Sequence, residues 1–500
     1  MVTKDQWARW GLAALLLAYL AAGVAFAIFT PPWQAPDEPA HYNYVRHLAE
    51  GRGLPVLLPG DYPHEYLEAI KARRFPGDMP LTPLRYEFHQ PPLYYLLAAP
   101  VYRLFGGALL PLRLLSVLLG GMLLWAIWRL VRTALSGREG LALTTAAFAA
   151  FLPMHVAFAA AVNNDILAEL WLALGAWGLL CYVVGGRQHE SRLLLATGLV
   201  IGLGLLTKTS AYVLLPLALA AVILRQGWLA RGDASPEDPR KRLGAAARQT
   251  AALLGPAVLL GALWWGRNLW VYGGSDFLGL QRHNAVVTGQ PRTAEWLAAL
   301  GGWELAHRFL LTTFHSFWGQ FGWMGVLLDS RMYQALGALS LAVTVGLVAF
   351  AWRVRVVISQ RREEAAALGL LALWGLLTLA AYFWYNIGFV QHQGRYLFPA
   401  LAPLGLAFAL GWRELGRPRL ARLAAGVLAV AAVALGVWGM AQGAVDKWGV
   451  ALFLGGAVGL SGLSLLPAWG RLVLHGALYL ALWVLDFVCL FLFVVPALRG

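Results

Sequence analysis

Residues 7–29 read WARWGLAALLLAYLAAGVAFAIF, a long apolar run with Lys4 and Arg9 at its start. A helix of this length crosses the hydrocarbon core of a bilayer, which needs about 20 residues. No A-x-A-like cleavage site follows, only Thr30-Pro31-Pro32-Trp33. We therefore expect a retained first transmembrane helix rather than a cleaved signal peptide.

The rest of the chain has the same character. Of its 500 residues, 59% are hydrophobic and 13% are charged, against about 25% charged residues in a typical soluble protein. Further apolar runs begin near residues 113, 141, 165, 192, 210, 250, 333, 364, 395, 423, 448 and 472. The sequence predicts an all-α polytopic membrane protein with about thirteen transmembrane helices. It excludes a soluble enzyme, a disordered chain and a repeat solenoid.

The net charge of +14 is unevenly distributed among the loops. With a cytoplasmic N-terminus, the loops on that side carry 22 basic and 9 acidic residues, net +13, and the rest of the chain carries 17 and 16, net +1. The positive-inside rule therefore predicts this orientation in the cytoplasmic (inner) membrane. It requires that residues 91–105 and 309–328 form helices at the outer surface without crossing the membrane.

Two large loops then face outward, residues 30–111 and 272–332, and the first contains unusual polar residues. Asp37 and Glu38 begin a short helix just after the first span, where carboxylates stabilise the helix N-terminus. Glu38 and His41 are three residues apart and share a helical face. Together with His89 near the end of the loop, they either bind a divalent metal or form hydrogen bonds only.

Several motifs follow one another in the chain. The loop opens with Asp37-Glu38 and closes with His89-Gln90-Pro91-Pro92-Leu93-Tyr94-Tyr95. The later motifs are Arg113-Leu114-Leu115-Ser116, Asn163-Asn164-Asp165, Leu206-Thr207-Lys208, Arg267-Asn268 with Tyr272-Gly273, and His392-Gln393-Gly394-Arg395-Tyr396. As a set, over about residues 1–400, they resemble the GT-C superfamily of membrane glycosyltransferases. The nearest similarity is to protein O-mannosyltransferases and the bacterial lipid A aminoarabinose transferase. One departure is Asn-Asn-Asp where those families more often have R-x-D.

The resemblance implies a glycosyltransferase that takes a sugar from a polyprenyl-phosphate donor. The acceptor would be a glycan, lipid or protein at the outer face, and the transfer an inverting direct displacement. No nucleic-acid partner is implied. It further implies Asp37 as general base, Glu38 as a ligand of the acceptor or a metal, and Asp165 as a supporting acid. Lys208, Arg267 and Arg395 are the expected contacts of the donor phosphate, since cations stabilise a departing phosphate.

Three further expectations concern the surroundings of the site. Residues 314–323, rich in aromatic side chains, either cover the site or belong to an interfacial aromatic belt. Residues 1–412 are expected to form the catalytic module and residues 413–500 a set of C-terminal helices. Two other functions stay open: a glycan ligase or polymerase using a polyprenyl-diphosphate donor, and a transporter of lipid-linked sugar. The residues identify neither the sugar nor the acceptor.

Overall fold

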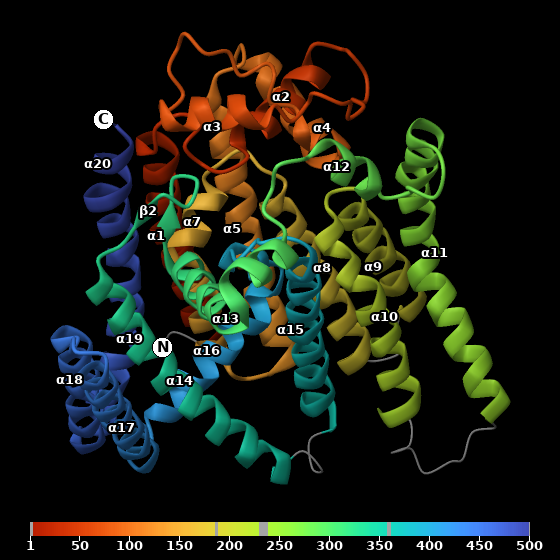
Figure 1. Cartoon of the computed structure of the whole chain (residues 1–500). Coiled ribbons are helices and arrows are strands. Elements are labelled where there is room, and N and C mark those ends of the chain that lie inside the picture. Colours follow the sequence, from red (N-terminus) through yellow and green to blue (C-terminus); the bar gives the residue numbers. More distant parts are fainter. Residues whose placement is uncertain (1–3, 186–188, 230–238, 358–361, 500) are drawn as a thin grey trace.

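The computed structural model describes residues 4–185, 189–229, 239–357 and 362–499. In these ranges the chain is mostly helical (Figure 1). The only strands described are β1 (Gln320–Phe321) and β2 (Val326–Leu327), which pair antiparallel in a short hairpin. The predicted all-α polytopic architecture is confirmed.

Eleven segments of the described residues are long and apolar enough to cross a membrane. They comprise α1 (Lys4–Phe29), α5 (Leu109–Ala134), α8 (Asp165–Val184), η2 (Thr209–Val213) with α10 (Leu214–Ile223) and η3 (Leu224–Leu229), α11 (Pro239–Tyr272), α14 (Ser330–Val357), α15 (Arg362–Gly388), η5 (Gly394–Ala400) with α16 (Leu401–Leu415), α17 (Pro418–Ala441), α18 (Lys447–Leu465), and α19 (Ala468–Val488) with η6 (Cys489–Val494) and α20 (Val495–Leu498). A twelfth is the pair α6 (Glu139–Ala150) and α7 (Pro153–Ala159), which is bent by 69°.

The structure thus has 11 or 12 candidate spans among the described residues where the sequence predicts about thirteen, and the difference lies in α9 (Glu190–Leu205). With 16 residues this helix is about 24 Å long, short of the hydrocarbon thickness of a bilayer. Its two ends nevertheless reach opposite ends of the bundle. The carbonyl of Leu206, just after the helix, accepts a hydrogen bond from Leu93 N, and the Glu190 side chain accepts one from Gln249.

The remaining helices belong to the two large loops. The first contains α2 (Glu38–Ala49), α3 (His64–Ala72), η1 (Tyr86–His89) and α4 (Leu93–Leu104), and the second contains α12 (Leu280–Val286) and α13 (Thr293–Trp318). Neither α4 nor α13 is among the candidate spans. The expected helix over 309–328 is wrong in its second half, because α13 ends at Trp318 and the β hairpin follows. Figure 1 shows α2, α3, α4 and α12 gathered at one end of the bundle.

Polar contacts join the loops separately at the two ends of the bundle. At the end that carries α2 and α4, which we call the site face, Lys208 forms an ion pair with Asp165 at 2.7 Å. At the opposite end, which we call the basic face, Arg138 pairs with Glu364 at 2.8 Å. Each pair links two loops at the same end of the bundle. The packing of the helices thus keeps the two groups of loops apart.

Candidate active site

Asp37 occupies an unusual backbone position at the start of α2. It is the N-cap residue, with φ 67° and ψ −8°, and its side chain does not cap the helix. Asp tolerates such left-handed geometry better than most residues, and strained backbone positions cluster at functional sites. Because the side chain is not used for capping, its carboxylate is directed to other partners.

Those partners come from distant parts of the chain. Arg395 Nη2 lies 2.9 Å from Asp37 Oδ2, and the Tyr86 hydroxyl donates to Asp37 Oδ1 at 3.0 Å. The Arg395 guanidinium also stacks over Phe158, 4.7 Å from the ring centroid. The 3-10 helix η5, which carries Arg395, and the η1 turn, which carries Tyr86, therefore converge on the start of α2.

Arg395 reaches this position because η5 packs directly against α13. The amide of Gly394 donates to Ser316 Oγ at 2.7 Å, and a Cβ atom on Gly394 would lie 2.5 Å from both Phe317 Cα and Thr313 O. Only glycine permits this approach, since atoms of the α13 backbone occupy the space that a side chain needs. The glycine in the Gln-Gly-Arg-Tyr motif is thus explained by packing.

Replacing Gly394 by Ala is expected to destabilise the protein by about 1–3 kcal/mol, the usual cost of overpacking. The added methyl group must push η5 away from α13 and displace Arg395 from Asp37. The measurement is the midpoint of thermal unfolding in detergent. The matched control is Gly369→Ala in α15, where no atom lies within 4 Å of the added Cβ. Equal midpoints for the two variants would contradict this prediction.

A second ion pair lies at the N-terminus of α8. Lys208 Nζ is 2.7 Å from Asp165 Oδ1 and donates to Asn164 Oδ1 at 3.0 Å. The amide group of Asn164 in turn donates to Gln90 Oε1 at 3.3 Å and to the Thr207 carbonyl at 3.1 Å. The Asn-Asn-Asp, Leu-Thr-Lys and His-Gln-Pro-Pro motifs, scattered in sequence, are therefore interlocked at one place.

A cavity of about 220 Å³ opens beside Asp37. Its lining combines acids, cations and aromatic rings: Pro36, Asp37, Tyr62, Leu67, Glu68, Lys71, Tyr86, Glu87, His283, Val287, Gln290, Trp323, Met324, Tyr385, Gln391, Gln393, Arg395 and Tyr396. Asp165 and Lys208 are not in this lining, but their charges reach its edge. The charge of Lys208 lowers the pKa of Glu87. It also lowers the pKa of His41, whereas the charge of Asp165 raises the pKa of His41.

Glu87 is the main cavity residue to which the sequence analysis gave no role. Its Oε2 atom is buried and has no hydrogen-bond partner among the described residues. Burial raises the pKa of Glu87, and the nearby charge of Asp37 adds to this effect, while His41 and Lys208 oppose it. The sequence offered one indication of a role for Glu87: it lies two residues before His89, which begins the motif that closes the first loop.

The pKa of Asp37 is shifted in the opposite direction. Burial alone would raise it, but the charges of Arg395 and His41 and the hydrogen bonds from Arg395 and Tyr86 outweigh burial and lower it. The cavity thus contains two carboxyl groups whose pKa values are moved apart. Such pairs are typical of sites in which one acid is ionised and the other retains its proton.

Glu38 lies next to Asp37 in sequence but is fully buried away from the cavity. Its carboxylate forms a two-pronged ion pair with Arg113, at 2.8 and 2.6 Å, and accepts hydrogen bonds from Trp33 N and Val162 N. Arg113 also donates to the carbonyls of Ala27, Thr30 and Pro31. The geometry gives Glu38 a structural contact in place of the expected contact with an acceptor or a metal.

The expected metal trio of Glu38, His41 and His89 is not brought together. His41 Nδ1 is 2.8 Å from the Tyr95 hydroxyl, and His89 Nδ1 is 2.9 Å from the Tyr86 carbonyl. Across the described ranges, no three His, Cys, Asp or Glu side chains are placed to hold a metal ion. These residues do not fit a metal, and we assign no step of the chemistry to one.

Arg267 lies apart from the other two expected phosphate contacts. Its guanidinium donates to the Pro55 carbonyl and to Asn268 Oδ1, and stacks over Trp264 at 4.8 Å. It therefore anchors a segment of the first loop to the end of α11, and it is not in the cavity lining.

The aromatic segment 314–323 is divided between two environments. Trp318 and Phe321 are buried in the core, whereas Trp323 lines the cavity. The Trp323 indole donates to the Trp33 carbonyl at 3.0 Å, and Lys71 lies 5.2 Å from the centroid of its ring. Only the end of this segment borders the site, so an aromatic surface is available to the cavity at one residue rather than along the whole segment.

A scan against protein families matches residues 89–232 to the family described as dolichyl-phosphate-mannose-protein mannosyltransferase. The fold and this match confirm the expected resemblance to the GT-C membrane glycosyltransferases. The match supports the predicted glycosyltransferase activity over the part of the chain that it covers. A search of curated proteins found no match to the chain.

Solved structures of three proteins are similar to the chain at low sequence identity. ArnT from Cupriavidus metallidurans, bound to undecaprenyl phosphate, is 15% identical over 99% of this chain and 77% of its own, with a TM-score of 0.47. The oligosaccharyltransferase of Archaeoglobus fulgidus is 16% identical over 92% and 55%, with a TM-score of 0.46. The S. cerevisiae protein O-mannosyltransferase Pmt1-Pmt2 complex, bound to its sugar donor, is 17% identical over 54% and 34%, with a TM-score of 0.40. The chain thus spans about half the length of the archaeal enzyme.

Proposed function

We propose that the protein transfers a sugar from a polyprenyl-phosphate carrier to an acceptor at the outer face of the cytoplasmic membrane. The observation that carries this proposal is the convergence of Asp37, Glu87 and Arg395 on one cavity, with the Asp165–Lys208 pair beside it. Sugar transfer needs a carboxylate to accept the proton of the attacking hydroxyl and cations to stabilise the departing phosphate. Both kinds of group lie at the site face.

In this mechanism Asp37 accepts the proton while the hydroxyl oxygen attacks the anomeric carbon. The bond from that carbon to the phosphate oxygen breaks in the same step, so the configuration inverts and polyprenyl phosphate leaves. Arg395 and Lys208 contact the phosphate. Without donor each cation is paired with a carboxylate, and an arriving phosphate competes for both, since Arg binds phosphate through two parallel hydrogen bonds. When Arg395 binds the phosphate it no longer pairs with Asp37, so the pKa of Asp37 rises and its carboxylate becomes a stronger base.

The orientation and extent of the catalytic module are part of the same proposal. The loops of the basic face carry the excess positive charge, so we place that face and the N-terminus in the cytoplasm. The cavity-lining residues all fall between Pro36 and Tyr396. This supports residues 1–412 as the catalytic module and residues 413–500 as an addition to it.

The function is tested by mass spectrometry of envelope lipids and glycans from cells with and without the chain. We expect one species to gain the mass of one sugar only when the chain is present. Purified chain in liposomes should also release free polyprenyl phosphate from a polyprenyl-phosphate sugar when envelope extract is added. A transporter would redistribute the donor without releasing the carrier, and that outcome would overturn the proposal.

The pH dependence of transfer tests the pairing of Arg395 with Asp37. The carboxylate is the active form, and its lowered pKa keeps it ionised as the pH falls. In Arg395→Gln the burial of Asp37 is no longer opposed by the guanidinium, so the pKa rises and the carboxylate is protonated at a higher pH. We expect the acidic limb of kcat/KM to move upward by about 1–3 pH units.

The control for this experiment is Arg267→Gln, since the contacts of Arg267 are with Asn268, Pro55 and Tyr272. Its acidic limb should stay where it is in the unmodified protein. An unshifted limb in Arg395→Gln would show that another group sets the acidic limit.

A further inference from the structure

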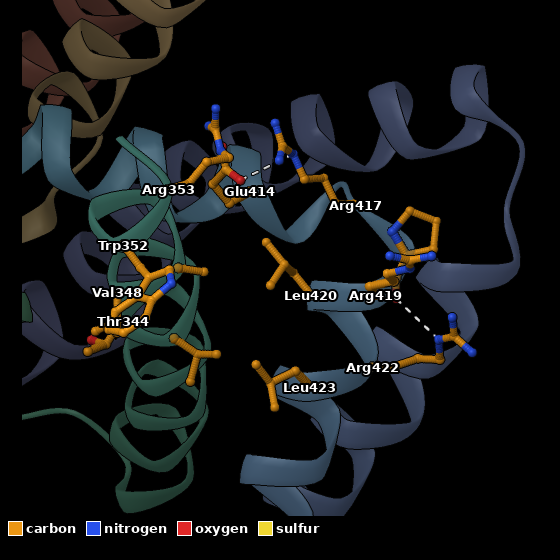
Figure 2. A pocket seen from close by; sticks show the side chains of 13 residues that line it. Thr344, Val348, Trp352, Arg353, Glu414, Arg417, Arg419, Leu420, Arg422 and Leu423 are labelled. Atoms are coloured by element: carbon orange, nitrogen blue, oxygen red, sulfur yellow. Dashed lines mark hydrogen bonds and ion pairs between the residues drawn. The ribbon is translucent and has the colours of Figure 1, made fainter. Parts of the chain in front are cut away.

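An apolar groove of about 860 Å³ lies on the basic face, away from the cavity (Figure 2). One wall is α14, with Val348 and Trp352 facing the gap, and the other is the start of α17, with Leu420 and Leu423. Three of these four side chains are more than half exposed: Val348 at 63%, Trp352 at 64% and Leu423 at 55%. The groove opens on the surface of two helices long and apolar enough to cross a membrane.

One end of the groove is strongly basic. Arg353, Arg417, Arg419 and Arg422 all line it, and the only acid in the lining is Glu414. Glu414 is 5% exposed and pairs with Arg353 and with Arg417, the latter at 3.2 Å. Neither Arg419 nor Arg422 has an acidic partner among the described residues. The lining therefore carries a net charge of +3 beside an apolar slot.

The groove is held open by the packing beneath it. Gly346 in α14 lies directly against Gly411 in α16, and a Cβ atom on either glycine would collide with the backbone of the other helix. Small residues permit such close contacts between membrane helices. The α14 wall is therefore fixed next to α16, and α17 starts just beyond Glu414.

The charge pattern indicates the kind of molecule that fits this groove. A helix of a second copy or of another protein would fill the apolar slot but leave the unpaired arginines without anions. An anionic lipid satisfies both parts, because an acyl chain fills the slot and a phosphate meets the arginines. Basic pockets between membrane helices on the cytoplasmic side bind acidic lipid head groups in this way. Arg suits phosphate through its planar fork of donors.

We propose that this groove binds one anionic glycerophospholipid, with an acyl chain between α14 and α17 and the phosphate on Arg417, Arg419 and Arg422. The site is distinct from the cavity near Asp37 and does not depend on the proposed transferase function.

Native mass spectrometry of the purified full-length chain tests the proposal, with phosphatidylglycerol as the probe and phosphatidylethanolamine as its zwitterionic counterpart. We expect a phosphatidylglycerol adduct that survives detergent removal, bound at least tenfold more tightly than phosphatidylethanolamine. The double variant Arg419→Gln/Arg422→Gln should lose this preference. Val348→Trp, which fills the slot, should weaken binding at least tenfold without changing the thermal unfolding midpoint.

The matched control is Arg331→Gln, an exposed arginine at the other end of α14 that pairs with Asp329 at 3.4 Å. It should bind phosphatidylglycerol as the unmodified chain does. Equal loss of lipid in this control would overturn the proposal, because the effect would then reflect net charge alone. Displacement of phosphatidylglycerol by an equal amount of polyprenyl phosphate, or a dimer that Val348→Trp abolishes, would also overturn it.

Discussion

Asp37→Asn is expected to reduce sugar transfer by about 10²–10⁴-fold, the usual contribution of a general base. The amide has nearly the shape of the carboxylate. Its oxygen can still accept the hydrogen bond from the Tyr86 hydroxyl, which lies 3.0 Å from Asp37 Oδ1 in the unmodified protein. It cannot take up a proton from the attacking hydroxyl. We therefore expect kcat to fall while the protein level and the binding of the lipid donor persist. The measurement is the release of polyprenyl phosphate by purified variant in liposomes.

The control for Asp37→Asn is Asp78→Asn in the same loop. Asp78 is 63% exposed and pairs with Arg73 at 2.9 Å, outside the cavity lining. Its transfer rate should equal that of the unmodified protein. Full activity in Asp37→Asn would show that Asp37 is not the base and would make Glu87, the buried carboxyl group in the cavity lining, the next candidate.

Glu38→Ala is expected to destabilise the fold by about 3–5 kcal/mol, since removal of one partner leaves the other charge buried and unpaired. Arg113 is 3% exposed and Glu38 is fully buried, so water cannot replace the lost carboxylate. The amides of Trp33 and Val162 lose their acceptor as well. We expect a lower thermal unfolding midpoint and poor recovery from the membrane. Glu38→Gln should lose less stability than Glu38→Ala, because the amide oxygen of Gln still accepts hydrogen bonds.

Glu50→Ala is the matched control, because Glu50 pairs with Arg46 at 2.7 Å on the exposed surface at the end of the same helix. Exposed ion pairs contribute about 0–1 kcal/mol. A stable Glu38→Ala protein that has lost transfer would contradict the structural assignment. It would instead support the contact with an acceptor that the sequence analysis expected.

The relation between sequence and fold differs from one helix to another. Runs such as residues 7–29 predicted their spans well, because about 20 apolar residues in a row suit few environments other than a bilayer. The run near residue 141 proved to be two helices, since Pro153 has no amide hydrogen to continue the first. Residues 309–328 were wrongly taken as one helix, because apolarity alone does not reveal the hairpin after Trp318.

The candidate site shows a similar division. The motifs predicted Asp37, Asp165, Lys208 and Arg395 as site residues, and the structure brings them together as two neighbouring ion pairs. Their catalytic and binding roles stay predictions. Which cation pairs with which acid was not accessible from the sequence, because Arg395 and Asp37 are 358 residues apart. The resemblance implied that Glu38 binds an acceptor or a metal, and the sequence does not show that its carboxylate is buried against Arg113.

The sequence by itself determined the class of fold and the end of the bundle at which polar chemistry gathers. Apolar length and loop charge are local properties, and the membrane acts on each segment separately. Only the tertiary structure decided that Asp37 faces the cavity while its neighbour Glu38 is buried against Arg113. A left-handed turn at one residue sends the two side chains in different directions. That turn is held by contacts with η1, η5 and α5, which no single segment of the sequence contains.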